Sequence, residues 1–590
     1  MDTNRRRSSH NTGLDYPLFN QQTGRLEADV TSFHRIAQLT DVVDLPTLIR
    51  GAKLSRQRWN KNTAGLTEAE EIIVGREMRE ISIPWLQNRS LLVTIMTTAC
   101  AAITQGWQQS TINSSSLLNW EEELGLNHDQ HQLLIGLINA APWLSGSLIG
   151  TWLSDPLQDH FGRRPALFVA AIFCVVLVIG IWIPPKVCLV ANPSFDPGTA
   201  HCKTWETLLV CRILLGVGIG SKASIAPIFA AEAAPDQHRG QVLMLWQLFD
   251  ALGIFLGFVS VLIVMDSWRV LLATATIPAI VLLFLVFICP ESPRYLIQKN
   301  KYADAYQSLL ELRGTPVQAA RDLYYIHCQL QTEAITKWDP PQTSEESFSW
   351  QRGDGYAYQQ WIKKGNFFKR MRYLATDDRT RRACIVALIV MASQQLCGIN
   401  VLTFYSSSLF NKGAFLNSST VIKWYNFSFG LANFLFTLPV LGFIDSRGRR
   451  PLLLVSFTGM LFSLIAISGF FKIANESTKG ILIGVFSIVF FLFFYSIGAG
   501  PIPFTLSAEV FPLCVRGKLM NSSICHQPGL IHARGWNEFQ RYDQLPWPWD
   551  LGSFCSSVNI RIQGPGKPFV FLLVRFDFLS IFQFAALLTA

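Results

Sequence analysis

Charged side chains are scarce in this sequence: Asp, Glu, Lys and Arg make up 15% of its 590 residues, whereas 50% are hydrophobic and 12% are aromatic. A water-soluble protein of this length carries more charge, so the composition indicates a membrane protein. The net charge of +9 does not favour nucleic-acid binding, because the basic residues cluster in the N-terminal region and in loops rather than among exposed aromatic residues. Orientation in a bilayer explains this charge better.

Patterns that mark a metal site or an enzyme are also missing. The 12 cysteines are scattered, with no Cys-x-x-Cys and no His/Cys cluster at metal-ligand spacing. We find no nucleophile–base pair, and the lone histidines His131, His160 and His238 are expected at helix ends or in loops. The sequence therefore predicts no metal, no cofactor and no enzymatic activity.

The start of the chain has no apolar stretch that resembles a secretory signal. Residues 1–88 are polar and begin with Arg5-Arg6-Arg7, so we predict a cytoplasmic tail. The spacing of apolar residues over Thr67–Glu80 favours a surface helix that lies against the membrane domain, with a partly disordered tail as the alternative.

From Ser90 onward, the sequence contains apolar segments of about twenty residues, the length that crosses a hydrocarbon core about 30 Å thick. The predicted spans are 91–108, 130–153, 166–184, 207–230, 241–265, 268–289, 383–409, 424–444, 452–473 and 480–504. A soluble protein does not contain so many segments of this length with so few charges. The sequence therefore predicts an all-α membrane protein.

The spans and loops divide the chain into five predicted regions. These are a cytoplasmic tail (1–88), a first transmembrane half (89–289), a cytoplasmic middle loop (290–382), a second transmembrane half (383–523) and a divergent C-terminal segment (524–590). The orientation follows from Gly106–Asp129, which contains no Lys or Arg, and from Pro290–Arg382, which is rich in both. Cys188 and Cys202 then share a loop outside the cytoplasm, where a disulfide is one hypothesis and free thiols are the alternative.

The middle loop has helical pieces such as Ala303–Leu312. Its basic patches can meet anionic lipid headgroups, and a solvated loop is the alternative interpretation. The basic residues are Lys363, Lys364, Lys369, Arg370 and Arg372. Membrane lipid is in either case a predicted partner of the whole chain, because the spans require a bilayer.

One heptad occurs twice, as Asp159-His-Phe-Gly-Arg-Arg-Pro165 and as Asp445-Ser-Arg-Gly-Arg-Arg-Pro451, each time between two apolar segments. A tight turn between two membrane helices needs a glycine for its unusual backbone angles, and the two arginines hold the turn on the cytoplasmic side. The recurrence in the same setting predicts two structurally related halves.

Polar groups inside the spans are candidate functional residues. Arg212 opens a span that continues with Gly216, Gly218 and Gly220, small residues that let helix backbones approach closely. An arginine within a span is costly unless it is paired or faces water. Three amides, Gln394, Gln395 and Asn400, occur together in another span.

Amide side chains offer both donors and acceptors, so they match neutral polyhydroxyl ligands. A break at Gly398 would bring Gln394 and Asn400 to one cavity, and Gln247 and Asn433 add amides from two other spans. The alternative is that these amides only hold helices together.

Taken together, these motifs resemble the sugar porter family of the major facilitator superfamily, and particularly its fungal sugar and polyol transporters, over about residues 90–520. The match includes the two heptads, the Arg212 glycine run, Pro290-Glu-Ser-Pro-Arg294, Gln394-Gln-x-x-Gly-x-Asn400 and Glu509-x-Phe-Pro512 with Arg516-Gly517. The resemblance implies two six-helix halves and transport by alternating access.

The resemblance also implies roles for individual residues. Residues in the substrate-binding positions are Gln247, Gln394, Gln395, Asn400, Asn433 and, as an aromatic lid, Phe504. Residues in the cytoplasmic charge network are Asp159, Arg163, Arg164, Glu232, Arg239, Glu291, Arg294, Asp445, Arg449, Arg450, Glu509 and Arg516. Phe504 replaces a tryptophan that many relatives carry, so a relative's substrate preference does not transfer.

A further departure concerns proton coupling. Proton-coupled members carry Gly-Tyr/Trp-Asp in the first span, where the aspartate lies beside the arginine that corresponds to Arg212, whereas this chain has Gly106-Trp107-Gln108. Because glutamine does not titrate, we predict facilitated diffusion rather than proton symport. Asp250 can face the same cavity as Gln247 and is a possible substitute proton carrier, with a buried ion pair as the alternative.

The C-terminal segment departs most strongly. Ile524–Lys567 is rich in Pro, Gly, Trp, Arg and Asp and contains no possible span, and Phe569–Ala590 is interrupted by Arg575 and Asp577. The change resembles a shifted reading frame or a retained intron, so we expect an incomplete second half with about 10–11 spans in all.

The function predicted from the sequence is transport of a sugar or polyol across a membrane, and the expected location is the plasma membrane. The alternatives are a sensor that binds sugar without transporting it, favoured by the tail, and a transport-dead truncated product, favoured by the C-terminal segment.

Overall fold

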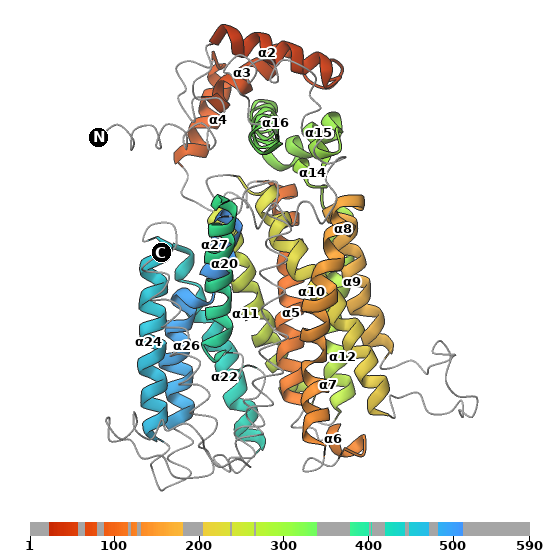
Figure 1. Ribbon diagram of the computed structural model, residues 1–590, viewed down its shortest axis with the longest axis vertical. Coiled ribbons are helices and arrows are strands. Elements are labelled where there is room, and N and C mark those ends of the chain that lie inside the picture. Colours follow the sequence, from red (N-terminus) through yellow and green to blue (C-terminus); the bar gives the residue numbers. More distant parts are fainter. Residues whose placement is uncertain are drawn as a thin grey trace, which may run out of the picture.

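The structure is a computed structural model that describes residues 23–56, 65–79, 88–115, 120–126, 131–180, 204–235, 239–264, 267–338, 378–399, 403, 419–442, 448–470 and 482–510. Cys188, Cys202 and the predicted segment 524–590 lie outside these residues. Every regular element among the described residues is a helix, and the helices form a long bundle with a smaller cap at one end (Figure 1).

The first half of the bundle contains most of the long apolar helices. Its elements are α5 (Arg89–Ser115), α6 (Trp120–Glu123), α7 (Gln132–Ser145), η4 (Gly146–Gly150), α8 (Thr151–Phe161), α9 (Arg163–Gly180), α10 (Trp205–Ala233), α11 (Arg239–Ile263), α12 (Trp268–Thr274) and α13 (Thr276–Ile288). The π-helical η4 joins α7 to α8 in one continuous span.

The second half contains α20 (Asp378–Leu396), α22 (Ser419–Thr437), α24 (Arg449–Phe470), η6 (Ser487–Phe491), α26 (Leu492–Phe494), η7 (Tyr495–Ala499) and α27 (Ile502–Val510). By length and composition, 7 helices of the described residues can cross a membrane. Helices α9, α20 and α22 overlap the other three predicted spans. Helices α20 and α22 begin before the predicted apolar segments, because helical hydrogen bonding continues into polar residues beyond the hydrocarbon core.

Close backbone contacts hold the first half together. The glycine run of α10 packs on η4, where a Cβ atom at Gly220 would collide with the carbonyl group of Gly146. The same holds for Gly106 of α5 against the carbonyl group of Asp250 on α11. Small residues therefore permit the helix approach that the sequence predicted.

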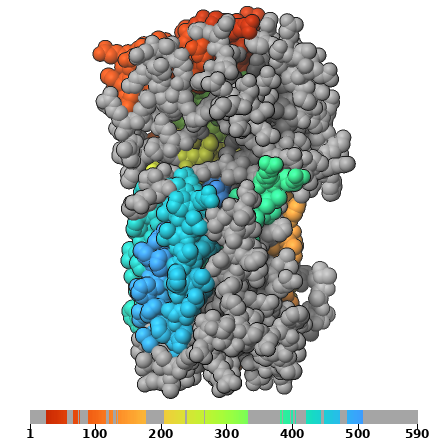
Figure 2. Space-filling view, turned by 60° about the vertical axis from the view of Figure 1, so that its left-hand side comes forward, coloured from red at the N-terminus to blue at the C-terminus, as the bar shows by residue number. Residues whose placement is uncertain are grey.

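The cap consists of helices from the tail and from the middle loop. They are α2 (Thr23–Ile36), α3 (Leu45–Arg56), α4 (Glu68–Arg79), α14 (Pro293–Gln298), α15 (Tyr302–Arg313) and α16 (Pro316–Trp338). Leu26, Val30 and Phe33 of the tail share one apolar core with Tyr302 and Leu323 of the loop. In the space-filling view the tail residues, in red, lie at the outer end of the molecule (Figure 2).

Two expectations about the tail and the middle loop can be compared with the cap. Helix α15 covers the predicted Ala303–Leu312 piece. Helix α4 forms within the predicted Thr67–Glu80, but its buried Val74 packs against Leu54 of α3 and Val317 of α16, so it contacts the cap rather than the membrane helices. The physical reason is that α3 and α16 supply an apolar surface for that side chain.

Candidate functional site

A cluster of buried polar side chains lies where the two halves meet. The amide Nε2 of Gln394 on α20 donates to the carbonyl oxygen of Gly500 at 2.9 Å and lies 3.5 Å from the hydroxyl of Tyr495 on η7. The Tyr495 hydroxyl also interacts with the side chain of Gln247 on α11. All three side chains are buried, so the cluster joins both halves inside the bundle.

Two breaks in the helices create this geometry. Helix α20 ends at Leu396, and Gly398 has a φ of 90°, a left-handed conformation that favours glycine. This confirms the predicted break, although Asn400 lies outside the described residues. The second break falls between η7 and α27, at Gly500 and Pro501, and leaves the Gly500 carbonyl free to accept from Gln394.

The other candidate substrate residues lie around this cluster or are described only in part. Asn433 of α22 is buried, and its Oδ1 accepts a hydrogen bond from the hydroxyl of Ser496 at 3.4 Å. Ser496 directly follows Tyr495 in the sequence. Phe504 of α27 faces Trp246 of α11, with ring centroids 6.3 Å apart. Gln395 is half-buried on α20.

The residues predicted to bear on coupling differ in their hydrogen bonding among the described residues. Arg212 is buried, donates from Nη1 to Oδ1 of Asn139 at 2.6 Å, and lies over the ring of Trp120. Both amide atoms of buried Gln108 have no hydrogen-bond partner among the described residues. Arg212 therefore has an amide partner on α7 that the motif comparison does not indicate.

One charged residue was missed by the sequence interpretation. Lys222, in the middle of α10, is 0% exposed. It interacts with the thiol of Cys174 on α9 and, electrostatically, with Asp250 of α11, which in turn acts on Tyr495. The available signal was a lysine inside a predicted span, where a charge is costly.

The charge network at the capped end is assembled within the first half. Arg163, at the start of α9, binds both carboxylate oxygens of Glu232 at 3.0 Å, and the Ser292 hydroxyl donates to the same carboxylate at 2.6 Å. The carboxylate of Glu291 accepts the backbone N–H groups of Arg163 at 3.0 Å and Arg164 at 3.3 Å. An acidic group thus caps the first turn of α9.

The turn between α8 and α9 makes this network possible. Gly162 has a φ of 103°, and Gly448 in the second heptad has a φ of 81°, which confirms that both heptads need glycine. A Cβ atom at Gly162 would lie 2.6 Å from Oε2 of Glu291. Burial raises the pKa of the Glu291 carboxyl group, an effect opposed by the backbone N–H donors of Ser292, Arg164 and Arg163.

The remaining members of the predicted network have varied surroundings. Arg294 is buried and acts electrostatically on Glu232, as Asp159 does on Arg163. The Arg239 guanidinium donates to the carbonyl of Ala231 at 3.2 Å, and that of Arg164 to the carbonyl of Phe287. Arg449 and Arg450 begin α24. Asp445, Arg516 and the side chain of Glu509 lie outside the described parts, so only the first-half network is visible.

The cap is bonded directly to the end of this network. Arg313 of α15 donates to the carbonyl groups of Ala233 at 2.8 Å and Ala234 at 3.3 Å, at the end of α10. It also pairs with Asp322 at 2.7 Å. Burial opposes ionisation of Asp322, but the guanidinium groups of Arg321 and Arg313 outweigh it and lower its pKa to about 2. The Ser308 hydroxyl donates to the backbone carbonyl of Glu291 at 2.6 Å.

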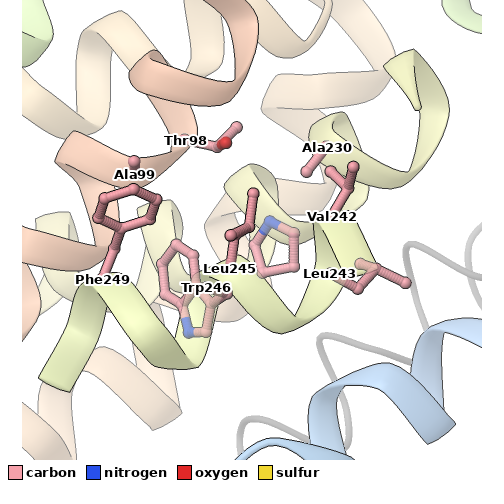
Figure 3. Close-up of a pocket in the computed structure, with 9 residues that line it drawn as sticks. Thr98, Ala99, Ala230, Val242, Leu243, Leu245, Trp246 and Phe249 are labelled. Carbon is pink, nitrogen blue, oxygen red and sulfur yellow. The ribbon is translucent and has the colours of Figure 1, made fainter. Parts of the chain in front are cut away.

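A small pocket lies near the same end, between α5, α10 and α11 (Figure 3). Its lining is Thr98, Ala99, Pro227, Ala230, Val242, Leu243, Leu245, Trp246 and Phe249. Only Thr98 offers a polar side-chain group besides the indole of Trp246, so this apolar pocket does not match a polyhydroxyl ligand. The amide cluster is the better candidate site.

Two helical halves around a buried polar cluster, with a charge network at one end, define a multi-pass membrane transporter of the major facilitator fold. The chain belongs to the sugar (and other) transporter family, whose sequence profile matches residues 93–528.

Individual relatives agree with this assignment. The putative metabolite transport protein YwtG of Bacillus subtilis is 29% identical over 68% of this chain and 76% of its own length. The galactose-proton symporter of Escherichia coli is 27% identical over 62% of this chain and 68% of its own length. The probable polyol transporter 4 of Arabidopsis thaliana is 28% identical over 69% of this chain and 68% of its own length. A structure of the proton:xylose symporter XylE matches with a TM-score of 0.63 and 20% identity over 84% of this chain and 94% of that one, which shows the fold.

Proposed function

We propose that this protein carries a neutral sugar or polyol across a membrane by alternating access of its two halves. The observation that supports this most directly is the buried cluster of Gln247, Gln394 and Tyr495, which offers amide and hydroxyl groups at the junction of the halves. A galactose-proton symporter and a probable polyol transporter are among its relatives, which agrees with this ligand class. We also propose that, within the family, the protein is most similar in function to the fungal sugar and polyol transporters that its motifs resemble.

The proposed mode is facilitated diffusion, with the N-terminus in the cytoplasm and the plasma membrane as location. Gln108 stands where proton-coupled members are expected to have an aspartate, and an amide does not carry a proton. Arg212 has an amide partner in Asn139. The basic middle loop supports the orientation.

Uptake by proteoliposomes tests this mode. We expect purified protein to admit labelled D-glucose, D-galactose, D-xylose or D-sorbitol down its concentration gradient, at an initial rate that a protonophore leaves unchanged. Empty liposomes are the control. Sugar-driven acidification of the vesicle interior, or accumulation driven by an imposed proton gradient, would establish symport instead.

The substitution Gln394→Ala tests the site itself. It removes the amide that bonds to Gly500 and Tyr495, so we expect sugar binding to weaken by about 1–3 kcal/mol, because buried groups lose their partners. Gln307→Ala, at an exposed position on α15, is the matched control and should bind as the parent does. Titration calorimetry in nanodiscs gives the affinities, and an unchanged value for Gln394→Ala would remove this residue from the site.

A sugar sensor is the second candidate, and the folded cap favours it. The tail contributes α2 and α3 to an apolar core shared with α15 and α16, which gives a cytoplasmic signal a structured element to act on. Sugar binding without uptake of label would support the sensor, and would equally fit a product whose divergent segment 524–590 prevents transport. Sequencing the mature transcript across codons 510–590 separates the sensor from the transport-dead product. Only the transport-dead product requires the altered reading frame.

A further inference from the structure

The N-terminal tail packs against the middle loop through a contact that leaves no room for a side chain. Gly51 of α3 is buried, and a Cβ atom there would lie 2.7 Å from the backbone nitrogen of Arg321 and 2.9 Å from the Cβ atom of Ala320, both on α16. These distances are shorter than van der Waals contact. A larger residue in place of Gly51 therefore pushes α3 away from α16.

The tail also shares an apolar core with α14 of the middle loop. Val30 and Phe33 of α2 and Leu48 of α3 are buried in one cluster with Tyr295 and Leu296 of α14. Helix α14 is the part of the cap nearest the membrane bundle (Figure 1). Undocking the tail therefore exposes apolar side chains of α14 as well as those of α2 and α3, and removes support from α14.

Helix α14 is in turn bonded to the charge network. The hydroxyl of Ser292 accepts the backbone N–H of Tyr295 at 3.3 Å, which caps α14, and donates to the carboxylate of Glu232 at 2.6 Å. The Tyr295 hydroxyl donates to the carbonyl of His160 at 2.8 Å, and its ring centroid lies 5.4 Å from the guanidinium carbon of Arg163. The first turn of α14 therefore contacts both members of the Arg163–Glu232 pair.

A second path leads from α3 to the same end of the bundle through α16. The backbone nitrogen of Arg321 is the atom nearest to a Cβ atom at Gly51. The side chains of Arg321 and Arg313 both bind Asp322 at 2.7 Å. Arg313 also donates to the carbonyl of Ala233, the last residue of α10, at 2.8 Å. Unbroken contacts therefore join the tail to the network along both paths.

We propose that the tail is a regulatory strap. Docking of α2 and α3 on the middle loop holds α14 and the Arg163–Glu232 pair in their bonded arrangement, and release of the tail loosens both. Because coupling between two sites is reciprocal, a change in the network equally alters the docking of the tail. The strap acts within the chain, so this inference goes beyond the proposed function and does not depend on which ligand the bundle binds.

Hydrogen exchange of the full-length protein in nanodiscs tests the strap with Gly51→Ala and Gly51→Gln. Both substitutions favour a helix over glycine, so α3 stays helical while its contact with α16 is lost. We expect exchange of α3 and of the Arg163 and Arg164 amides to accelerate together, by about 10-fold or more for Gly51→Gln and by less for Gly51→Ala. Gly24→Gln on α2 is the matched control and should change neither, because nothing lies within 4 Å of a Cβ atom there.

Glu232→Gln tests the reverse direction, because it changes a residue of α10 rather than of the tail. We expect α3 to exchange about 5-fold or more faster in this variant than in the parent. Unchanged exchange at the start of α9 while α3 accelerates in the Gly51 variants would overturn the strap. Unchanged protection of α3 in Gly51→Gln or in Glu232→Gln would do so too. None of these measurements uses a sugar, so a failure of the proposed function does not affect their outcome.

Discussion

The substitution Glu232→Gln is expected to loosen the capped end of the bundle by about 3–5 kcal/mol, because it leaves the Arg163 guanidinium buried without its counter-ion. The two side chains are only 9% and 5% exposed, and the bond is bidentate at 3.0 Å. Ser292 loses a charged acceptor at the same time. We therefore expect the helices of the first half to separate more readily at this end, with a lower melting temperature.

Hydrogen exchange at the start of α9 measures this effect. The backbone N–H groups of Arg163 and Arg164 bond to Glu291, so separation of these helix ends should accelerate their exchange by about 100-fold or more, the factor that corresponds to 3 kcal/mol or above. The double variant Arg163→Gln/Glu232→Gln should recover part of the protection, because it removes both buried charges.

An ion pair with an exposed carboxylate provides the control. Glu123 binds Arg269 at 2.6 Å, but its side chain is 49% exposed, so Glu123→Gln should cost no more than about 1 kcal/mol. Equal effects of Glu232→Gln and Glu123→Gln, or unchanged exchange at α9, would show that the Arg163–Glu232 pair does not hold this end closed.

The features that the sequence predicted well are local ones. Gly162, Gly398 and Gly448 all adopt positive φ, as expected for glycines in a tight turn or a helix break. The chemistry of these positions is contained in a few neighbouring residues. The helix approach of Gly220 on Gly146 was also predictable, because small residues in a span serve few other purposes.

The features that the sequence did not predict depend on partners that are distant along the chain. The resemblance places Arg212 beside the position of Gln108, yet Arg212 donates a hydrogen bond to Asn139, because its partner depends on how α7 packs against α10. Lys222 is one lysine within a glycine-rich run, and its partners, Cys174 of α9 and Asp250 of α11, lie on other helices. Tail residues 23–56 were interpreted as part of a polar tail, because their apolar side chains form a core only together with those of α16.

The stability of the cap is expected to fall between pH 6.5 and pH 4 because of His327. Its ring lies 4.4 Å from that of Phe33 on α2, and its Nδ1 lies 3.0 Å from the Tyr302 hydroxyl. Burial lowers the pKa of His327 to about 4, below the ordinary value of 6.5. The imidazole is therefore neutral in the assembled cap at a pH where a solvent-exposed histidine is charged.

The sign of the effect follows from proton binding. Above pH 6.5 neither the docked nor the undocked form binds a proton at His327, whereas between pH 6.5 and about 4 only the undocked form does. Acid therefore favours undocking, and the cap loses up to about 3 kcal/mol over this window, with no further loss from this residue below pH 4.

Hydrogen exchange of α2 and α3 at pH 7 and pH 5, corrected for intrinsic exchange rates, measures the docking of the tail. We expect protection to fall at pH 5 in the parent, whereas His327→Phe keeps an aromatic ring against Phe33 but has no group that titrates, so its protection should be the same at both values. His160→Phe, at an exposed position on α8, is the control and should retain the parent's response. A response that persists in His327→Phe would assign the pH dependence to another group, because the neutral ring has nothing to protonate.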